Sequence, residues 1–439
     1  MTFPTAPLPR RLDQAEAFFW HLDRHSSMNF CVIAEGRGTL ASAALAAALP
    51  RLQARHPLLG VAIAADETRQ LCFQPMAAPP TLTVCQSTEQ DWRSQLAQAI
   101  AAPFTLGTAP LFRAAAYMLP DEHWVLGLIF HHSIADARSG FAVMREALRL
   151  AAGGSVDLTP IPPRAPLLSL YPAAWANTAG EQAAAALKAI KRDEHRALPP
   201  SERLPGYQEL PALESPAFVS LRYGADLVTR LGHRARSEHT TVHGVIGAAQ
   251  LLALRLQIEG SGDKTLGLTT PADLRATLET AMDADTPGFY VTLLAPVFAV
   301  GDVAHFWPLA RAISTRNREM LTRGDGHLFY HFFPPAESFS PDAAGQAAFD
   351  EMMRRGPQAS ALSNVGRLPA LGGLGNITVD QMSFSLFPAP KQPLFTSATT
   401  YDDVLTLNLN YDRLRLPEPL LRQIVHSLDH LLRQAASDD

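Results

Sequence analysis

Residues 125–140 read VLGLIFHHSIADARSG, and the rest of the chain is interpreted outward from this stretch. It begins with an apolar run, which is typical of a strand buried on both faces, although a buried helix segment gives the same pattern. A second apolar segment, residues 111–119, comes before it, and turn-forming residues at 120–122 lie between the two. The pair predicts a β-hairpin whose second strand ends at two adjacent histidines, His131 and His132.

A helix is predicted directly after the histidines. Ser139 is a suitable N-cap, and apolar residues follow at helical spacing until the glycines at 153 and 154 end the pattern. The first turn of a helix presents unpaired backbone N–H groups, which stabilise negative charge. Gly140 is therefore a candidate for stabilising an oxyanion.

The histidine pair is the expected centre of the chemistry. A neutral imidazole takes up protons effectively near pH 7. Because adjacent residues on an extended segment point in opposite directions, only one of the two histidines faces a given cavity. We assign His132 as the general base and His131 as its structural neighbour. Asp136 either orients an imidazole or forms an ion pair that fixes the loop.

Two other interpretations of the pair remain open. Histidines at a strand end are often hydrogen-bonded core residues without a catalytic role. A metal site is the second alternative, but neighbouring strand residues diverge and no nearby cysteine or acidic cluster completes a ligand set. We therefore expect no bound metal.

Composition narrows the possible functions. The 439 residues suit two domains, and a net charge of −5 offers no footprint for nucleic acid. No apolar run is long enough to span a membrane, and the N-terminus lacks the apolar core of a signal peptide. The three scattered cysteines form no disulfide or metal pattern. We expect a cytoplasmic monomer.

The stretch from His131 to Asp136 resembles the His-His-x-x-x-Asp-Gly signature of the condensation-domain superfamily. This superfamily includes condensation domains of nonribosomal peptide synthesis, polyketide-associated acyltransferases and, more distantly, chloramphenicol acetyltransferase. Ala137 departs from the usual glycine, and it would be strained if the backbone there required a positive φ. Residues 102–113, APFTLGTAPLFR, also resemble the segment that precedes the signature in condensation domains.

The resemblance implies an α/β fold. It would consist of two subdomains like chloramphenicol acetyltransferase, each a mixed β-sheet with helices, arranged as a V-shaped pseudo-dimer around a central tunnel. The N-terminal subdomain would cover residues 1–155 and the C-terminal subdomain residues 217–439. Recurrent prolines in residues 156–216 indicate a crossover linker, with a helix over residues 181–196.

The resemblance also implies further site residues. Residues 271–275, PADLR, are similar to an element whose arginine pairs with the aspartate of the signature, so Arg275 would hold Asp136 in a bidentate ion pair. Two other elements resemble strands of the superfamily: residues 288–293, GFYVTL, with Thr292 where asparagine is frequent, and residues 359–366, ASALSNVG, which are similar to a strand near the active-site tunnel of relatives. They give three candidates for contacting the substrate or an oxyanion: Thr292, Ser363 and Asn364.

The function implied is acyl transfer. An acyl group would move from a thioester donor, either acyl-coenzyme A or an acyl chain on the phosphopantetheine of a carrier protein. His132 would deprotonate an alcohol or amine acceptor, forming an ester or amide in natural-product or lipid biosynthesis without a resident cofactor. Two alternatives belong to other classes: a non-catalytic binding or recruitment module, and a metal-dependent hydrolase at the histidine pair.

Overall fold

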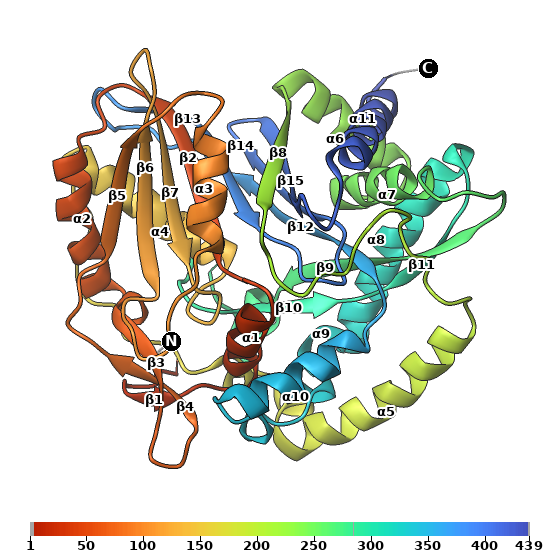
Figure 1. Cartoon of the computed structure of the whole chain (residues 1–439), viewed down its shortest axis with the longest axis horizontal. Coiled ribbons are helices and arrows are strands. Elements are labelled where there is room, and N and C mark those ends of the chain that lie inside the picture. Colours follow the sequence, from red (N-terminus) through yellow and green to blue (C-terminus); the bar gives the residue numbers. More distant parts are fainter. Residues whose placement is uncertain (1–3, 284, 438–439) are drawn as a thin grey trace.

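The computed structural model describes residues 4–283 and 285–437, which form an α/β fold built on two large sheets. In Figure 1 the first sheet and its helices lie on the left, and the second sheet and its helices lie on the right. Both sheets are mixed, because each contains parallel and antiparallel neighbours. The predicted fold class of mixed sheets with helices is confirmed.

The first large sheet contains the predicted hairpin. Its five strands, in spatial order, are β13 (Thr378–Leu386), β2 (Phe30–Arg37), β7 (His123–Phe130), β6 (Phe112–Met118) and β5 (Thr81–Gln86). Strands β6 and β7 pair antiparallel, with Phe112 opposite Phe130. Helices α2 (Ser42–Arg55) and α4 (Ala137–Ala151) share the main core with one face, and α3 (Trp92–Ala101) packs on the other. Strand β7 is therefore buried on both faces, as its apolar run predicted.

Smaller elements complete this half of the molecule. A three-stranded sheet is formed by β1 (Arg10–Arg11), β4 (Leu71–Pro75) and β3 (Val61–Ala65), and the short helix η1 (Pro57–Gly60) precedes β3. Helix α1 (Gln14–His25) lies at the front, between the two halves (Figure 1). Its start is fixed by a capping box in which Asp13 and Glu16 each bind the other's backbone N–H.

The segment between the two halves is partly helical. It contains η2 (Leu167–Leu170), η3 (Ala173–Trp175) and the long helix α5 (Asn177–Arg196), which runs along the lower right of the molecule in Figure 1. The helix predicted over residues 181–196 is confirmed, and it begins one turn earlier than predicted.

The second large sheet has seven strands. Six of them follow the order β10 (Val291–Leu294), β9 (Lys264–Asp273), β12 (Ala359–Leu368), β14 (Phe395–Tyr401), β15 (Val404–Asp412) and β8 (Pro216–Tyr223), and β11 (Val297–Val300) also pairs with β9. The remaining α-helices are α6 (Ala225–Ser237), α7 (Val242–Arg255), α8 (Phe306–Arg323), α9 (Asp325–Leu328), α10 (Ala343–Arg354) and α11 (Glu418–Ala435). Short 3₁₀ turns are η4 (Arg275–Thr277), η5 (Val303–His305), η6 (Tyr330–Phe332) and η7 (Ala336–Ser338).

Strand β13 connects the two halves. It comes from the C-terminal part of the chain but joins the first sheet, where Leu386 pairs with Phe30 and Thr378 pairs with Arg37. The division into residues 1–155, 156–216 and 217–439 stays a prediction, and β13 crosses it. Among the helices of residues 4–283 and 285–437, none has the length and apolar character needed to cross a membrane.

Candidate active site

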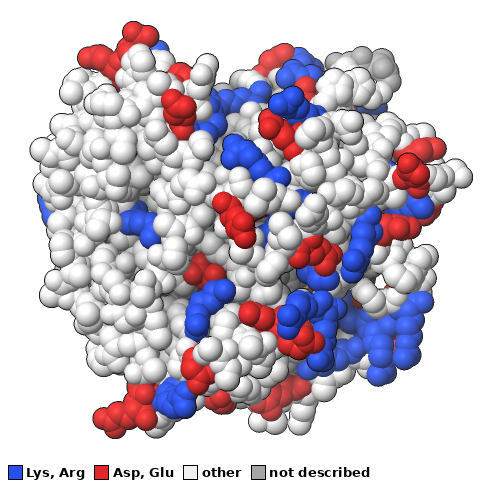
Figure 2. Space-filling view, viewed as in Figure 1, with Lys and Arg blue, Asp and Glu red and all other residues white. Residues whose placement is uncertain are grey.

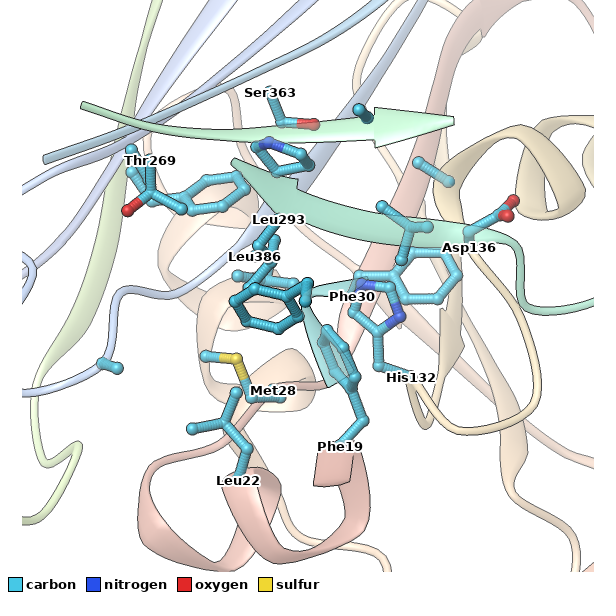
Figure 3. Close-up of a pocket in the computed structure, with 18 of the residues that line it drawn as sticks. Phe19, Leu22, Met28, Phe30, His132, Asp136, Thr269, Leu293, Ser363 and Leu386 are labelled. Atoms are coloured by element: carbon cyan, nitrogen blue, oxygen red, sulfur yellow. The ribbon is translucent and has the colours of Figure 1, made fainter. Parts of the chain in front are cut away.

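A cavity of about 370 Å³ lies between the two large sheets. Its wall combines residues of α1, β2 and the start of α4 with residues of β9, β10, β12, β13 and β14. Figure 3 shows His132 at this cavity, with Phe19 and Phe30 close to its ring. Most of the lining is aromatic or aliphatic, so the few polar side chains there are prominent.

The two histidines face opposite ways from the end of β7. His132 lines the cavity, and its ring centroid lies 4.5 Å from that of Phe19 and 4.9 Å from that of Phe30. His131 turns into the protein, where its Nδ1 accepts a hydrogen bond from the Ser133 N–H at 3.1 Å and its Nε2 lies 3.8 Å from Asp23. The predicted alternation is present, and it is His132 that reaches the cavity.

Burial sets the charge of His132. Desolvation lowers its pKa to about 4, although nearby backbone groups and the Asp136 carboxylate act in the opposite direction. At pH 7 the ring is therefore neutral. A neutral imidazole is the form that can accept a proton.

Asp136 fixes the loop rather than the imidazole. Its Oδ1 accepts hydrogen bonds from the N–H and hydroxyl of Ser139 and from Arg275, each at 2.9 Å, and its Oδ2 accepts one from the Tyr290 N–H at 3.1 Å. Burial would raise the pKa of Asp136, but the Arg275 charge and these hydrogen bonds outweigh it and hold the pKa below its usual value. The side chain is thus an ionised anchor between α4 and the second half of the molecule.

The predicted N-cap of α4 was wrong by three residues. The cap is Asp136, and the helix begins at Ala137, which places Ser139 at the third helical position. The Asp136 carboxylate accepts the Ser139 N–H, as an N-cap side chain does. Ala137 is helical and is not among the residues with positive φ, so the departure from glycine causes no backbone strain there.

The predicted contact between Asp136 and Arg275 is present, but it is not bidentate. One terminal nitrogen of Arg275 binds Asp136, and the other binds Asp273 Oδ1 at 2.9 Å. Arg275 also donates to the Thr286 carbonyl and lies over the Tyr290 ring, with 4.5 Å between guanidinium carbon and ring centroid. Asp273 precedes Arg275 by two residues and takes the nitrogen that a bidentate pair would have used.

Sequence reasoning missed the second half of this ion cluster. Asp273 also lies 3.2 Å from Arg138, whose guanidinium donates to the Val365 carbonyl at 2.9 Å. Acidic and basic side chains therefore alternate along this cluster, which joins the start of α4 to the end of β9. In order of contact they are Asp136, Arg275, Asp273 and Arg138. The signal in the sequence was the repeated spacing of two between each acid and its neighbouring arginine, in residues 136–138 and 273–275.

Two of the four oxyanion and substrate candidates do not fit that role. The Gly140 N–H already donates to the Asp136 carbonyl, and a Cβ on Gly140 would lie 2.8 Å from a Val32 methyl carbon, so this glycine serves close packing. Thr292 donates its hydroxyl to the Gly326 carbonyl at 2.6 Å and is fully buried. Along β10 it is the neighbours of Thr292 that line the cavity, because strand side chains alternate.

The other two candidates lie at the cavity. Ser363 and Asn364 both line it from β12, opposite α1 (Figure 3 shows Ser363). The Asn364 side-chain oxygen accepts the Gly366 N–H at 2.8 Å, and its amide nitrogen carries two N–H donor groups. Their contact with a substrate stays a prediction.

Comparisons with known proteins find similarities of sequence and of fold. A protein-family profile described as phthiocerol/phthiodiolone dimycocerosyl transferase C-terminus matches residues 213–409. Two curated relatives are each 27% identical to this chain: nonribosomal peptide synthetase kk1B of Curvularia clavata over 282 residues and phosphinothricin tripeptide synthetase PhsC of Streptomyces viridochromogenes over 289 residues. Each alignment covers 63% of this chain, but only 2% and 26% of the respective relatives, so the chain spans a small part of their length.

Solved structures extend the likeness to the whole chain. Polyketide synthase associated protein 5 from Mycobacterium tuberculosis is 16% identical, with a TM-score of 0.66 over 100% of both chains. Trichothecene 15-O-acetyltransferase from Fusarium sporotrichioides is 12% identical, with a TM-score of 0.73 over 99% of this chain and 98% of the other. These likenesses show the fold, and the profile and the curated relatives add the sequence relationship. The chain therefore has the chloramphenicol acetyltransferase-like fold of condensation domains and acyltransferases, and its sequence is similar to that of proteins of the condensation-domain superfamily.

Proposed function

We propose that this protein transfers an acyl group from a thioester to a hydroxyl or amine acceptor, with His132 as the general base. The observation that supports this most is the neutral imidazole of His132 at a cavity between the two halves of the molecule. The loop that carries His132 is held by Asp136, which contacts Arg275 from the second half of the molecule. A base held in this way meets its acceptor at a constant position.

The proposed step needs no covalent enzyme intermediate. His132 takes the proton of the acceptor O–H or N–H as the acceptor oxygen or nitrogen forms a bond to the thioester carbonyl carbon. The carbon–sulfur bond then breaks, and the imidazolium returns the proton to the leaving sulfur. The products are an ester or amide and a free thiol, so atoms and charges balance without a further reactant.

The surroundings of His132 favour this step. General-base catalysis typically contributes about 10² to 10⁴ in rate. The apolar walls exclude water from the thioester, and low local polarity strengthens the interactions of charge that develops at the carbonyl oxygen. Ser363 and Asn364 supply polar groups on the opposite wall of the same cavity, where they support a substrate contact.

The donor is proposed to carry its acyl group on a phosphopantetheine arm, of coenzyme A or of a carrier protein. Both are anionic. In Figure 2 basic side chains gather at the lower right, over the C-terminal end of α5. Lys188, Lys191, Arg192 and Arg196 line an open groove there, and they favour the approach of an anionic donor.

A metal-dependent hydrolase at the histidine pair has less support. The imidazoles of His131 and His132 face opposite ways, so they do not converge on one ion. Within the described residues, no three histidine, cysteine or acidic side chains are grouped as metal ligands would be.

A donor and acceptor panel tests the proposal. The purified protein is incubated with acetyl, hexanoyl and decanoyl thioesters of coenzyme A, or of a carrier protein, and with primary alcohols and amines. We expect one thiol released for each ester or amide formed, by mass spectrometry and thiol titration, and no loss of activity with EDTA. Hydrolysis that EDTA abolishes would favour the hydrolase. Thioester binding without thiol release would favour a recruitment module.

A further inference from the structure

One arm of the cavity is lined by side chains without charge or hydrogen-bonding groups. Figure 3 shows Leu22 and Met28 together at one end of the cavity, with Ser363 and Thr269 at the other end. His132 lies to one side between these ends (Figure 3). We call the first end the apolar arm, and we define it by six lining residues: Phe18, Leu22, Met28, Phe333, Met352 and Met353.

Helix α10 closes the apolar arm against α1. Gln346 and His21 are hydrogen-bonded, and one turn further along both helices His25 binds Asp350 at 3.0 Å. Both contacts join residues 325 positions apart, so the two helices run parallel in a fixed register. Met353, near the end of α10, and Met28, just beyond the end of α1, both line the cavity.

The base of the apolar arm is aromatic. The Phe18 ring centroid lies 4.5 Å from that of Phe333 and 5.6 Å from that of Phe349, which is on α10. These contacts fix the aromatic residues, whereas the unbranched methionines that also line the arm adapt their shape easily to what they contact. An arm of this composition is suited to a flexible hydrocarbon chain. A charged chain end would be desolvated there without a side-chain partner.

We propose that the acyl group transferred by this protein is an aliphatic chain longer than acetyl, and that its hydrocarbon part lies in the apolar arm. This inference rests on the proposed function, because the arm adjoins the base that the proposed function assigns. Met28 and Met353 both line the arm, so their volume limits how far a chain can extend. They are the specificity-determining residues of the site.

The magnitude of the preference follows from burial. Each buried methylene group favours binding by about fourfold. A hexanoyl chain has four more methylene groups than acetyl, so the arm should favour hexanoyl over acetyl by about 10²-fold in kcat/KM. A terminal ammonium group on the same chain, as in 6-aminohexanoyl, should remove this advantage.

Thioester series measure the preference directly. Acetyl, hexanoyl and 6-aminohexanoyl thioesters of coenzyme A are compared with one acceptor for the wild-type protein and for Met353→Trp. We expect a hexanoyl to acetyl ratio of about 10² in the wild type, and a fall of at least tenfold in this ratio for Met353→Trp, because the indole fills the arm. Met76→Trp is the matched control, since Met76 is 46% exposed and lies outside the cavity lining. Its ratio should equal that of the wild type.

Binding of unreactive analogues separates this inference from the proposed function. S-hexyl and S-ethyl coenzyme A lack the thioester carbonyl group and undergo no transfer, and their affinities are measured by calorimetry. Tighter binding of the S-hexyl analogue by about 10²-fold, reduced in Met353→Trp but not in Met76→Trp, supports the apolar arm even if no thioester is turned over. Equal affinities of the two analogues, or equal kcat/KM for acetyl and hexanoyl donors, would overturn it and leave acyl transfer standing.

Discussion

Ser139 holds the loop of the candidate active site through a single hydroxyl group. Its Oγ lies 2.7 Å from the Gly288 carbonyl oxygen and 2.9 Å from Asp136 Oδ1, and it accepts hydrogen bonds from the Gly288 N–H and from Arg275. Because the side chain is buried, water does not replace these bonds when the hydroxyl is removed. Ser139 therefore joins α4 to the segment before β10 as directly as Asp136 does.

We expect Ser139→Ala to lower the free energy of unfolding by about 1–3 kcal/mol, since it leaves buried polar groups without a partner. Urea denaturation measures this change. Ser169→Ala is the control, because the Ser169 hydroxyl is exposed and donates only to the nearby Pro166 carbonyl. It should change stability by less than about 0.5 kcal/mol. An unfolding midpoint for Ser139→Ala equal to that of the wild type would contradict the role of this hydroxyl.

For single residues, the sequence predicted which residues belong to the candidate active site better than it predicted how their side chains are oriented. The contact between Asp136 and Arg275 was predicted, because both residues stand in recognisable motifs. Its monodentate geometry was not, since nothing in the sequence shows that Asp273 competes for the same guanidinium. Thr292 was misplaced because a shift of one residue along a strand moves a side chain to the other face, and a single sequence does not fix that register.

Helix α1 shows how an element's own signals position the site. Asp13 accepts the Glu16 N–H at 2.9 Å, and Glu16 accepts the Asp13 N–H at the same distance. Asp13 also accepts the Leu168 N–H at 3.0 Å, which ties the start of the helix to the crossover segment. The cap thereby fixes the helix that places Phe19 against His132 and Leu22 in the apolar arm.

Removing this cap is expected to destabilise α1. Asp13→Ala should lower the free energy of unfolding by about 1–2 kcal/mol. The matched control is Asp302→Ala, since Asp302 caps only a three-residue turn in an exposed position. Both variants are compared by urea denaturation. If Asp13→Ala cost no more than Asp302→Ala, α1 would be held by packing alone, and the capping box would not matter.

Elements with strong local signals were predicted, and their partners in space were not. The hairpin, the helix after the histidine pair and the helix of the crossover segment were all predicted from local sequence patterns. The pairing of β13 with β2 joins residues more than 340 positions apart. Alternation of apolar residues indicates a strand, but it contains no information about which strand lies beside it.

The pH dependence of stability belongs to the whole molecule, because it sums over buried groups. Burial lowers the pKa of His21, His132 and His243 to about 4. Between pH 6.5 and about 4 these histidines bind protons in the unfolded chain but not in the folded one. Stability should therefore fall as the pH falls through this range. Burial raises the pKa of Asp13 to about 7, so the folded chain binds a proton at Asp13 that the unfolded chain does not bind. This contribution to the pH dependence of stability has the opposite sign and offsets about one of the three histidines.

We expect the free energy of unfolding to decrease from pH 7 to pH 5, by roughly 1.4 kcal/mol per pH unit for each net proton. Chemical denaturation at several pH values measures the slope. His21→Asn should flatten it, whereas His305→Asn should leave it unchanged because His305 is exposed on the surface. A stability that stays constant from pH 7 to pH 5 would contradict the charge states derived from burial.

The whole molecule brings one neutral imidazole to a cavity that two halves of the chain share, and the central claim is that this imidazole takes the acceptor's proton. The single-turnover rate of acyl transfer by His132→Gln tests it most directly, with melting temperature as the check on folding and His305→Gln as the matched control. The claim predicts a rate about 10² to 10⁴ lower than that of the wild type at an unchanged melting temperature, with His305→Gln unaffected. A folded His132→Gln protein that transfers acyl groups at the wild-type rate would contradict it.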